Sequence, residues 1–75
     1  MKPTENEVYD ALKVIVKNSH LKPLNYAVNY AKAGIGMTGH ELHVQCLYVL
    51  SNLQYWRGAE AKATRQLLKD FTGAK

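Results

Sequence analysis

The chain has 75 residues, of which 47% are hydrophobic and 21% charged, with a formal net charge of +4 and one cysteine. This length allows one domain (residues 1–75) and not two, and the hydrophobic content excludes a disordered protein. Cys46 has no partner for a disulfide, which is typical of proteins in a reducing compartment. The first residues lack a signal-peptide core and no apolar run approaches the roughly 20 residues of a membrane span, so we expect a cytoplasmic protein without a membrane segment.

The first two helices are predicted from their start signals. Thr4 and Glu7 have the spacing of a capping box, so a first helix should begin there and end near residues 18–20. Its core-facing side holds Val8, Tyr9, Leu12, Ile15 and Val16. Pro23 should open a second helix in its first turn, and Gly34 should follow that helix as its C′ residue. In this second helix Tyr26 and Tyr30, four residues apart, should lie together along one flank.

The third predicted helix is apolar on two sides. It should begin at Thr38, whose spacing to Glu41 repeats the capping box, and run to about Trp56. One arc of this helix contains Leu42, Cys46, Val49, Leu50, Leu53 and Trp56. The nearly opposite side contains Val44, Tyr48 and Tyr55, with Leu47 at its edge. Since a surface helix needs only one apolar stripe, this helix should be central to the fold or part of an interface.

A fourth helix should run from Ala59 to about Phe71 after a break at residues 57–58. Its inward face consists of Ala61, Thr64, Leu67, Leu68 and Phe71. No segment shows the alternating pattern of a strand. The sequence therefore predicts an all-α protein, a compact bundle of about four short helices.

Two short motifs resemble ligand sites. Residues 34–39 match G-x-G-x-x-G, but the preceding segment reads as helix and the chain is too short for the sheet of a dinucleotide-binding unit. A helix end and a turn explain these glycines better, although the N–H groups that open the third helix could hold a phosphate or carboxylate. His40, His43 and Cys46 are spaced three apart, which fans the side chains over about 120° and prevents all three from sharing one tetrahedral metal. We expect neither a metal nor a cofactor.

Catalytic arrangements are also missing from the pattern. Cys46 should face the core, whereas a reactive cysteine needs an accessible, electropositive setting. The carboxylates show no paired acid and base, so we expect no enzyme.

Tyrosines and basic residues offer two surfaces for partners. Tyr26, Tyr30, Val44, Tyr48 and Tyr55 are the candidates for a protein interface, because aromatic residues are favoured there. A central helix of a four-helix fold can also bury both of its sides within its own domain, and the sequence leaves these alternatives open.

The second surface is a cationic ridge made by Arg57, Lys62, Arg65 and Lys69, which could follow phosphates without reading sequence. A solvated helix face explains the same charges. A helix-turn-helix is disfavoured, because the connection between the second and third helices is long and contains three glycines.

Residues 48–58, followed by Glu60, Ala61, Lys62 and Arg65, resemble a pattern in small uncharacterised proteins of bacterial phages and prophages. The resemblance covers about the second half of the chain and implies an accessory role in a mobile element, with no ligand assigned. Together with the surfaces above, it predicts a small non-enzymatic interaction module that binds a protein partner or its own copy. The alternative is a non-specific nucleic-acid-binding accessory factor that uses the basic ridge.

Overall fold

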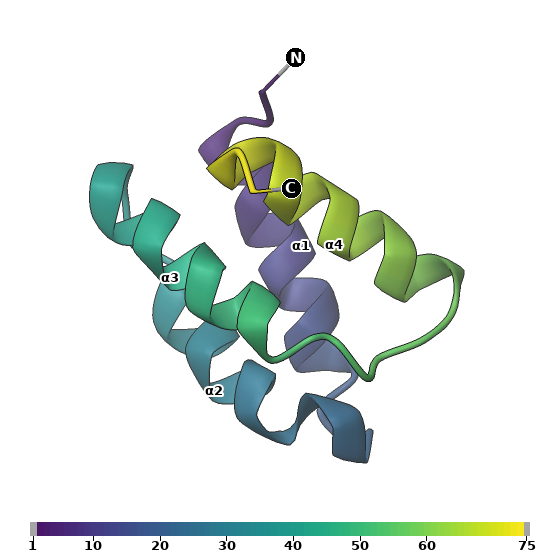
Figure 1. Ribbon diagram of the computed structural model, residues 1–75. Helices are drawn as coiled ribbons and strands as arrows, with labels where there is room; N and C mark the ends of the chain where they lie inside the picture. The colour runs from purple at the N-terminus through teal and green to yellow at the C-terminus, as the bar shows by residue number, and fades with distance from the viewer. Residues whose placement is uncertain (1, 75) are drawn as a thin grey trace.

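In the computed structural model, which describes residues 2–74, every regular element is helical. The elements are α1 (Glu5–Lys17), the 3₁₀ turn η1 (Lys22–Leu24), α2 (Asn25–Gly34), α3 (Gly39–Ser51) and α4 (Ala59–Thr72). Each α-helix packs on its neighbours in the chain, and α4 closes the ring against α1 (Figure 1). The expected all-α bundle of four short helices is confirmed.

One apolar core lies between the four helices, and each contributes a single buried stripe. The fully buried large side chains are Leu12, Ile15, Leu24, Leu42, Leu53, Leu68, Val8, Val49 and Cys46. Trp56 is also in the core, with 4% of its surface exposed, as the sequence predicted. Burial of these side chains is the main favourable term in folding a chain of this size.

The first helix starts as predicted. The Thr4 hydroxyl oxygen accepts the backbone N–H of Glu7 at 3.2 Å, and the Glu7 carboxylate accepts the Thr4 N–H at 3.1 Å. This capping box satisfies two donors that the first turn leaves without helical partners.

The predicted capping box at Thr38 is wrong, since the Thr38 side chain makes no capping hydrogen bond. The Gly39 N–H at the start of α3 instead donates to Glu5 Oε2 at 2.7 Å. A carboxylate from α1 therefore caps α3 across the bundle, which a local sequence pattern does not reveal.

The expected C′ role of Gly34 is also wrong, because Gly34 is the last residue of α2 and is buried. A Cβ built at this position would lie 3.0 Å from Leu12 Cδ1 and 3.2 Å from Gln45 Cγ. Gly34 thus allows α1 and α3 to approach the end of α2 closely.

The third helix is shorter than predicted and ends at Ser51 instead of near Trp56. Side chains compete for its last carbonyls: Ser51 Oγ donates to Leu47 O at 3.0 Å, and Asn52 Nδ2 donates to Tyr48 O at 2.9 Å. The following segment, residues 52–58, turns through short i→i+3 bonds that bring Trp56 onto the core. Tyr55 therefore belongs to this loop and not to the second side of α3.

Candidate functional site

Four of the five tyrosines are exposed, and they gather on the side of the bundle formed by α2, α3 and the loop after α3. The exposed fractions are 74% for Tyr26, 40% for Tyr30, 51% for Tyr48 and 71% for Tyr55. The fifth, Tyr9, is partly buried, and its hydroxyl donates to the Met37 carbonyl. We call Tyr26, Tyr30, Val44, Tyr48 and Tyr55 the tyrosine face.

Contacts join the members of the tyrosine face across two elements. The rings of Tyr30 in α2 and Tyr48 in α3 lie with centroids 5.8 Å apart and planes tilted by 37°. Val44 is one helical turn before Tyr48 and is half-buried beside it. The structure thus brings Tyr30, Val44 and Tyr48 together although the two tyrosines are 18 positions apart in the chain.

Tyr26 and Tyr55 line a common pocket of about 290 Å³ on this side. Lys22, Pro23, Ser51, Asn52 and Gln54 complete its lining. Although Tyr55 lies outside α3, the loop returns it to the same side of the molecule as Tyr26. All five predicted interface residues are therefore on this side, by a route that differs from the predicted one.

Close packing of α2 against α3 positions the tyrosine pair. Gln45 Nε2 donates to the Tyr30 carbonyl at 2.8 Å, and its side chain lies against Gly34. Because Gly34 has no side chain, α2 and α3 come near enough for the Tyr30 and Tyr48 rings to pack against each other.

The surroundings of the tyrosine face are polar and contain both uncharged and basic side chains. Its exposed or partly exposed polar neighbours in α2, α3 and the following loop are Asn25, Asn29, Ser51, Asn52 and Gln54. Lys22 lines the pocket together with Tyr26 and Tyr55, and Lys32 lies on the same arc of α2 as Asn25 and Asn29. Leu47, 38% exposed, adds apolar surface on α3.

The four residues of the predicted basic ridge have different surroundings. Arg57 and Lys62 are exposed, and Lys69 is partly buried. Arg65 is also partly buried, and its Nη1 donates to the Trp56 carbonyl at 2.5 Å and to the Leu53 carbonyl at 3.4 Å. The Arg65 guanidinium therefore holds the loop after α3, which the periodicity of α4 does not indicate.

The motif residues of α3 have ordinary structural contacts. The rings of His40 and His43 stack with centroids 6.1 Å apart, and His43 packs on Phe71 at 6.4 Å. Cys46 is fully buried, and burial raises the pKa of its thiol from 9.0 to about 11. Within residues 2–74 no three histidine, cysteine, aspartate or glutamate side chains gather in a way that could hold a metal ion. The Gly39 N–H, which the sequence offered to an anion, has the Glu5 carboxylate as its partner.

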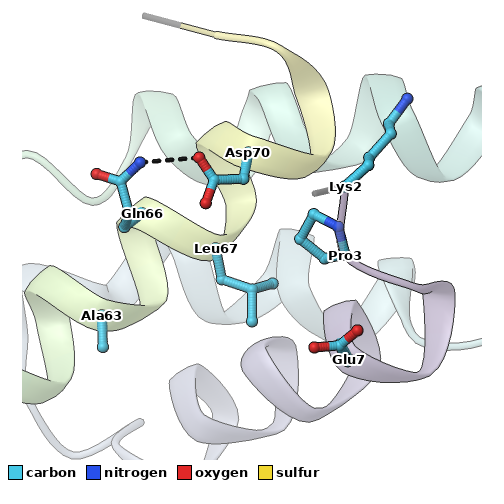
Figure 2. Close-up of a pocket in the computed structure, with 7 residues that line it drawn as sticks. All are labelled: Lys2, Pro3, Glu7, Ala63, Gln66, Leu67 and Asp70. Carbon is cyan, nitrogen blue, oxygen red and sulfur yellow. Dashed lines mark hydrogen bonds between the residues drawn. The ribbon is translucent and has the colours of Figure 1, made fainter.

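Sequence reasoning missed a groove between α1 and α4. Its larger pocket, of about 430 Å³, is lined by Lys2, Pro3, Glu7, Ala63, Gln66, Leu67 and Asp70 (Figure 2). The periodicity of α1 and α4 places the helical members of this set beside the core stripes, but only the packing of one helix on the other makes them neighbours.

None of the helices within residues 2–74 has the length and apolarity that crossing a bilayer requires. No protein-family model matches the chain, and neither a curated protein nor a solved structure matches it. The chemistry of the surfaces is therefore the basis for assigning a function.

Proposed function

We propose that the protein is a non-catalytic interaction module that pairs with a second copy of itself through the tyrosine face. The observation that carries this proposal is the exposure of four tyrosines on one side of a 75-residue chain. Tyrosine combines a large apolar ring with a hydroxyl that both donates and accepts, and it is enriched in protein interfaces.

The amount of aromatic surface agrees with a weak dimer. At about 200 Å² for one tyrosine side chain, the four exposed fractions amount to on the order of 500 Å². A standard interface buries about 800 Å² on each partner, so the polar neighbours would supply the remainder. Interfaces at this low end of the size range are typical of weak, transient complexes.

Charge favours a second copy as the occupant. Each copy has a formal net charge of +4, which opposes contact through basic surfaces. The tyrosine face is bordered by amides and hydroxyls together with Lys22, so two such faces can approach with less like-charge repulsion than two basic ridges would meet. Tyrosine hydroxyls and carboxamides contain both donors and acceptors, which lets identical surfaces satisfy each other around a two-fold axis.

Sedimentation equilibrium over a range of concentrations tests this proposal. The wild-type chain should change from its monomer mass of 8.4 kDa toward twice that mass as its concentration rises into the millimolar range. The triple variant Tyr26→Ser, Tyr48→Gln, Tyr55→Asn should stay monomeric, because all three side chains are exposed and their replacement removes the aromatic contact.

Tyr9→Phe is the matched control, because it alters a tyrosine away from the tyrosine face and should leave dimer formation unchanged. A wild-type chain that keeps the monomer mass at every concentration would overturn the proposal. So would a triple variant that is folded by circular dichroism and still forms dimers as well as the wild type.

A further inference from the structure

The groove between α1 and α4 is a second surface, independent of the tyrosine face. Two pockets, of about 430 and 230 Å³, adjoin along it and share Glu7, Ala63 and Leu67. In Figure 2 the Leu67 side chain projects from α4 toward α1, between Ala63 and Pro3. The two pockets therefore form one elongated depression.

Two contacts tie α1 and the segment before it to α4 along the groove. At one end, the Lys2 ammonium lies 5.6 Å from the centre of the Phe71 ring, which holds the segment before α1 against α4. At the other end, Asn18 Nδ2 donates to Glu60 Oε1 at 2.8 Å and to the Val14 carbonyl at 2.8 Å. The groove lies between these contacts, and a neighbouring pocket of about 410 Å³ adjoins it at Lys2 and Asp70.

Small side chains keep the floor of the groove open. Ala11 from α1 and Ala63 from α4 contribute only methyl groups, and Val14 and Leu67 are partly buried. Apolar residues make up most of the lining of the smaller pocket. The floor thus presents hydrocarbon that no element of residues 2–74 covers.

Carboxylates line both sides of this floor. Glu7 and Asp10 extend from α1 and Asp70 from α4, so the groove holds three of the six acidic side chains of a chain with a net charge of +4. Among residues 2–74, Lys2 is the only basic residue in its lining, and Figure 2 shows the Lys2 ammonium extending away from Glu7. The basic side chains of α4, Lys62 and Lys69, lie on a different flank of that helix, about 80° and 100° from Asp70. On α1, Lys17 and Lys13 lie about 20° and 60° beyond Asp10, on the side away from the groove.

We propose that this groove binds a basic amphipathic helix of a partner protein. The apolar face of such a helix would lie over Val14, Ala63 and Leu67, and lysine or arginine on both of its flanks would face Glu7, Asp10 and Asp70. This arrangement is the helix-in-groove mode of recognition, with charge deciding the type of helix. The acidic sides favour it over nucleic acid, since phosphates would be repelled.

A peptide titration followed by amide NMR tests the proposal. The probe is an 18-residue helix of alanine, leucine and lysine with its leucines along one face, and its control has glutamate in place of every lysine. The lysine peptide should shift the amides of residues 7–14 and 63–70, whereas the glutamate peptide should leave them unchanged.

The variant Glu7→Gln, Asp10→Asn, Asp70→Asn separates charge from folding. Glutamine at position 7 keeps the capping-box pattern, and asparagine at position 70 can still accept the 2.9 Å hydrogen bond from Gln66. Because an exposed ion pair changes binding about two- to threefold, the triple variant should bind the lysine peptide roughly tenfold more weakly at low salt. Glu41→Gln on α3 is the control and should bind like the wild type.

Equal binding of the lysine peptide to the wild type and the triple variant would overturn the proposal. Shifts that fall on the tyrosine face, or no shifts with either peptide, would also overturn it. If the groove instead receives a second copy, the triple variant will change the sedimentation mass and the proposal of a foreign helix is wrong.

Discussion

Replacing Arg65 by methionine should destabilise the protein, because Arg65 connects α4 to the loop after α3. The guanidinium donates to the Trp56 carbonyl at 2.5 Å and lies 3.4 Å from the Leu53 carbonyl. The Leu53 carbonyl also accepts the Trp56 N–H, so the Trp56 carbonyl is the acceptor that depends more on Arg65. Methionine retains the apolar stem of the side chain and removes its donors.

The size of the effect follows from the shorter bond. A hydrogen bond from a charged group contributes about 1.5–3 kcal/mol to the free energy of unfolding, and the 3.4 Å contact adds little. A chain of this length has a total free energy of unfolding of roughly 4–11 kcal/mol. Arg65→Met should thus remove about a third of the stability and lower Tm by roughly 10 °C.

Urea unfolding followed by tryptophan fluorescence measures this change directly. Trp56 is the only tryptophan and lies in the loop that Arg65 holds, with 4% of its surface exposed. Low micromolar protein keeps the chain monomeric during the measurement. Lys62→Met, an exposed change on the same helix, is the control and should alter the unfolding free energy by less than about 0.5 kcal/mol. If Arg65→Met and Lys62→Met unfold at the same urea concentration as the wild type, Arg65 belongs to a solvated ridge and our interpretation is wrong.

Changes at four further residues probe the fold. Gly58 has φ 112° and ψ 174°, which only glycine adopts readily, so Gly58→Ala should lower the free energy of unfolding in urea by about 1–3 kcal/mol. Gly73 has φ 76° and ψ 11°, where asparagine is tolerated, so Gly73→Asn should lower it by less than half as much. Burial holds the pKa of Cys46 at about 11 against 9.0, so iodoacetamide should label the folded protein at pH 8 far more slowly than the urea-unfolded chain, and equal rates would refute the burial. Because the folded protein favours the protonated Cys46 thiol, the thiol stabilises the fold fully below pH 9, and this stabilisation is lost as the pH rises through 11. The free energy of unfolding of Cys46→Ala should therefore fall less between these pH values than that of the wild type. Glu5→Ala should lower the free energy of unfolding by about 1 kcal/mol, because the Gly39 N–H loses its acceptor. Glu5→Gln should recover most of that loss. A Glu5→Ala variant as stable as the wild type would show that the cap contributes nothing.

The features that local patterns encode were predictable from the sequence. The capping box at Thr4 predicted the start of α1, and the apolar period predicted the burial of Leu42, Cys46 and Trp56. These features depend on residues within one or two helical turns of each other, where spacing determines geometry.

Features that depend on distant contacts were not predictable in the same way. The end of α3 depends on Asn52 and on the later Arg65, and the cap on Gly39 depends on Glu5, 34 residues earlier. The tyrosine face combines local and distant features. Residue spacing placed Tyr26 and Tyr30 on one flank, but only the loop after α3 carries Tyr55 to the same side. Likewise, no local pattern indicates that α1 and α4 enclose an acidic groove.

An isotope-filtered NMR experiment on mixed labelled and unlabelled chains tests the dimer through the tyrosine face most directly. At millimolar concentration, we predict nuclear Overhauser effects between the rings of Tyr26, Tyr48 and Tyr55 in one copy and the same rings in its partner. These effects should disappear on dilution to the low micromolar range. Intermolecular contacts confined to other surfaces, or none while the chain tumbles as an 8.4 kDa monomer, would contradict the proposed function.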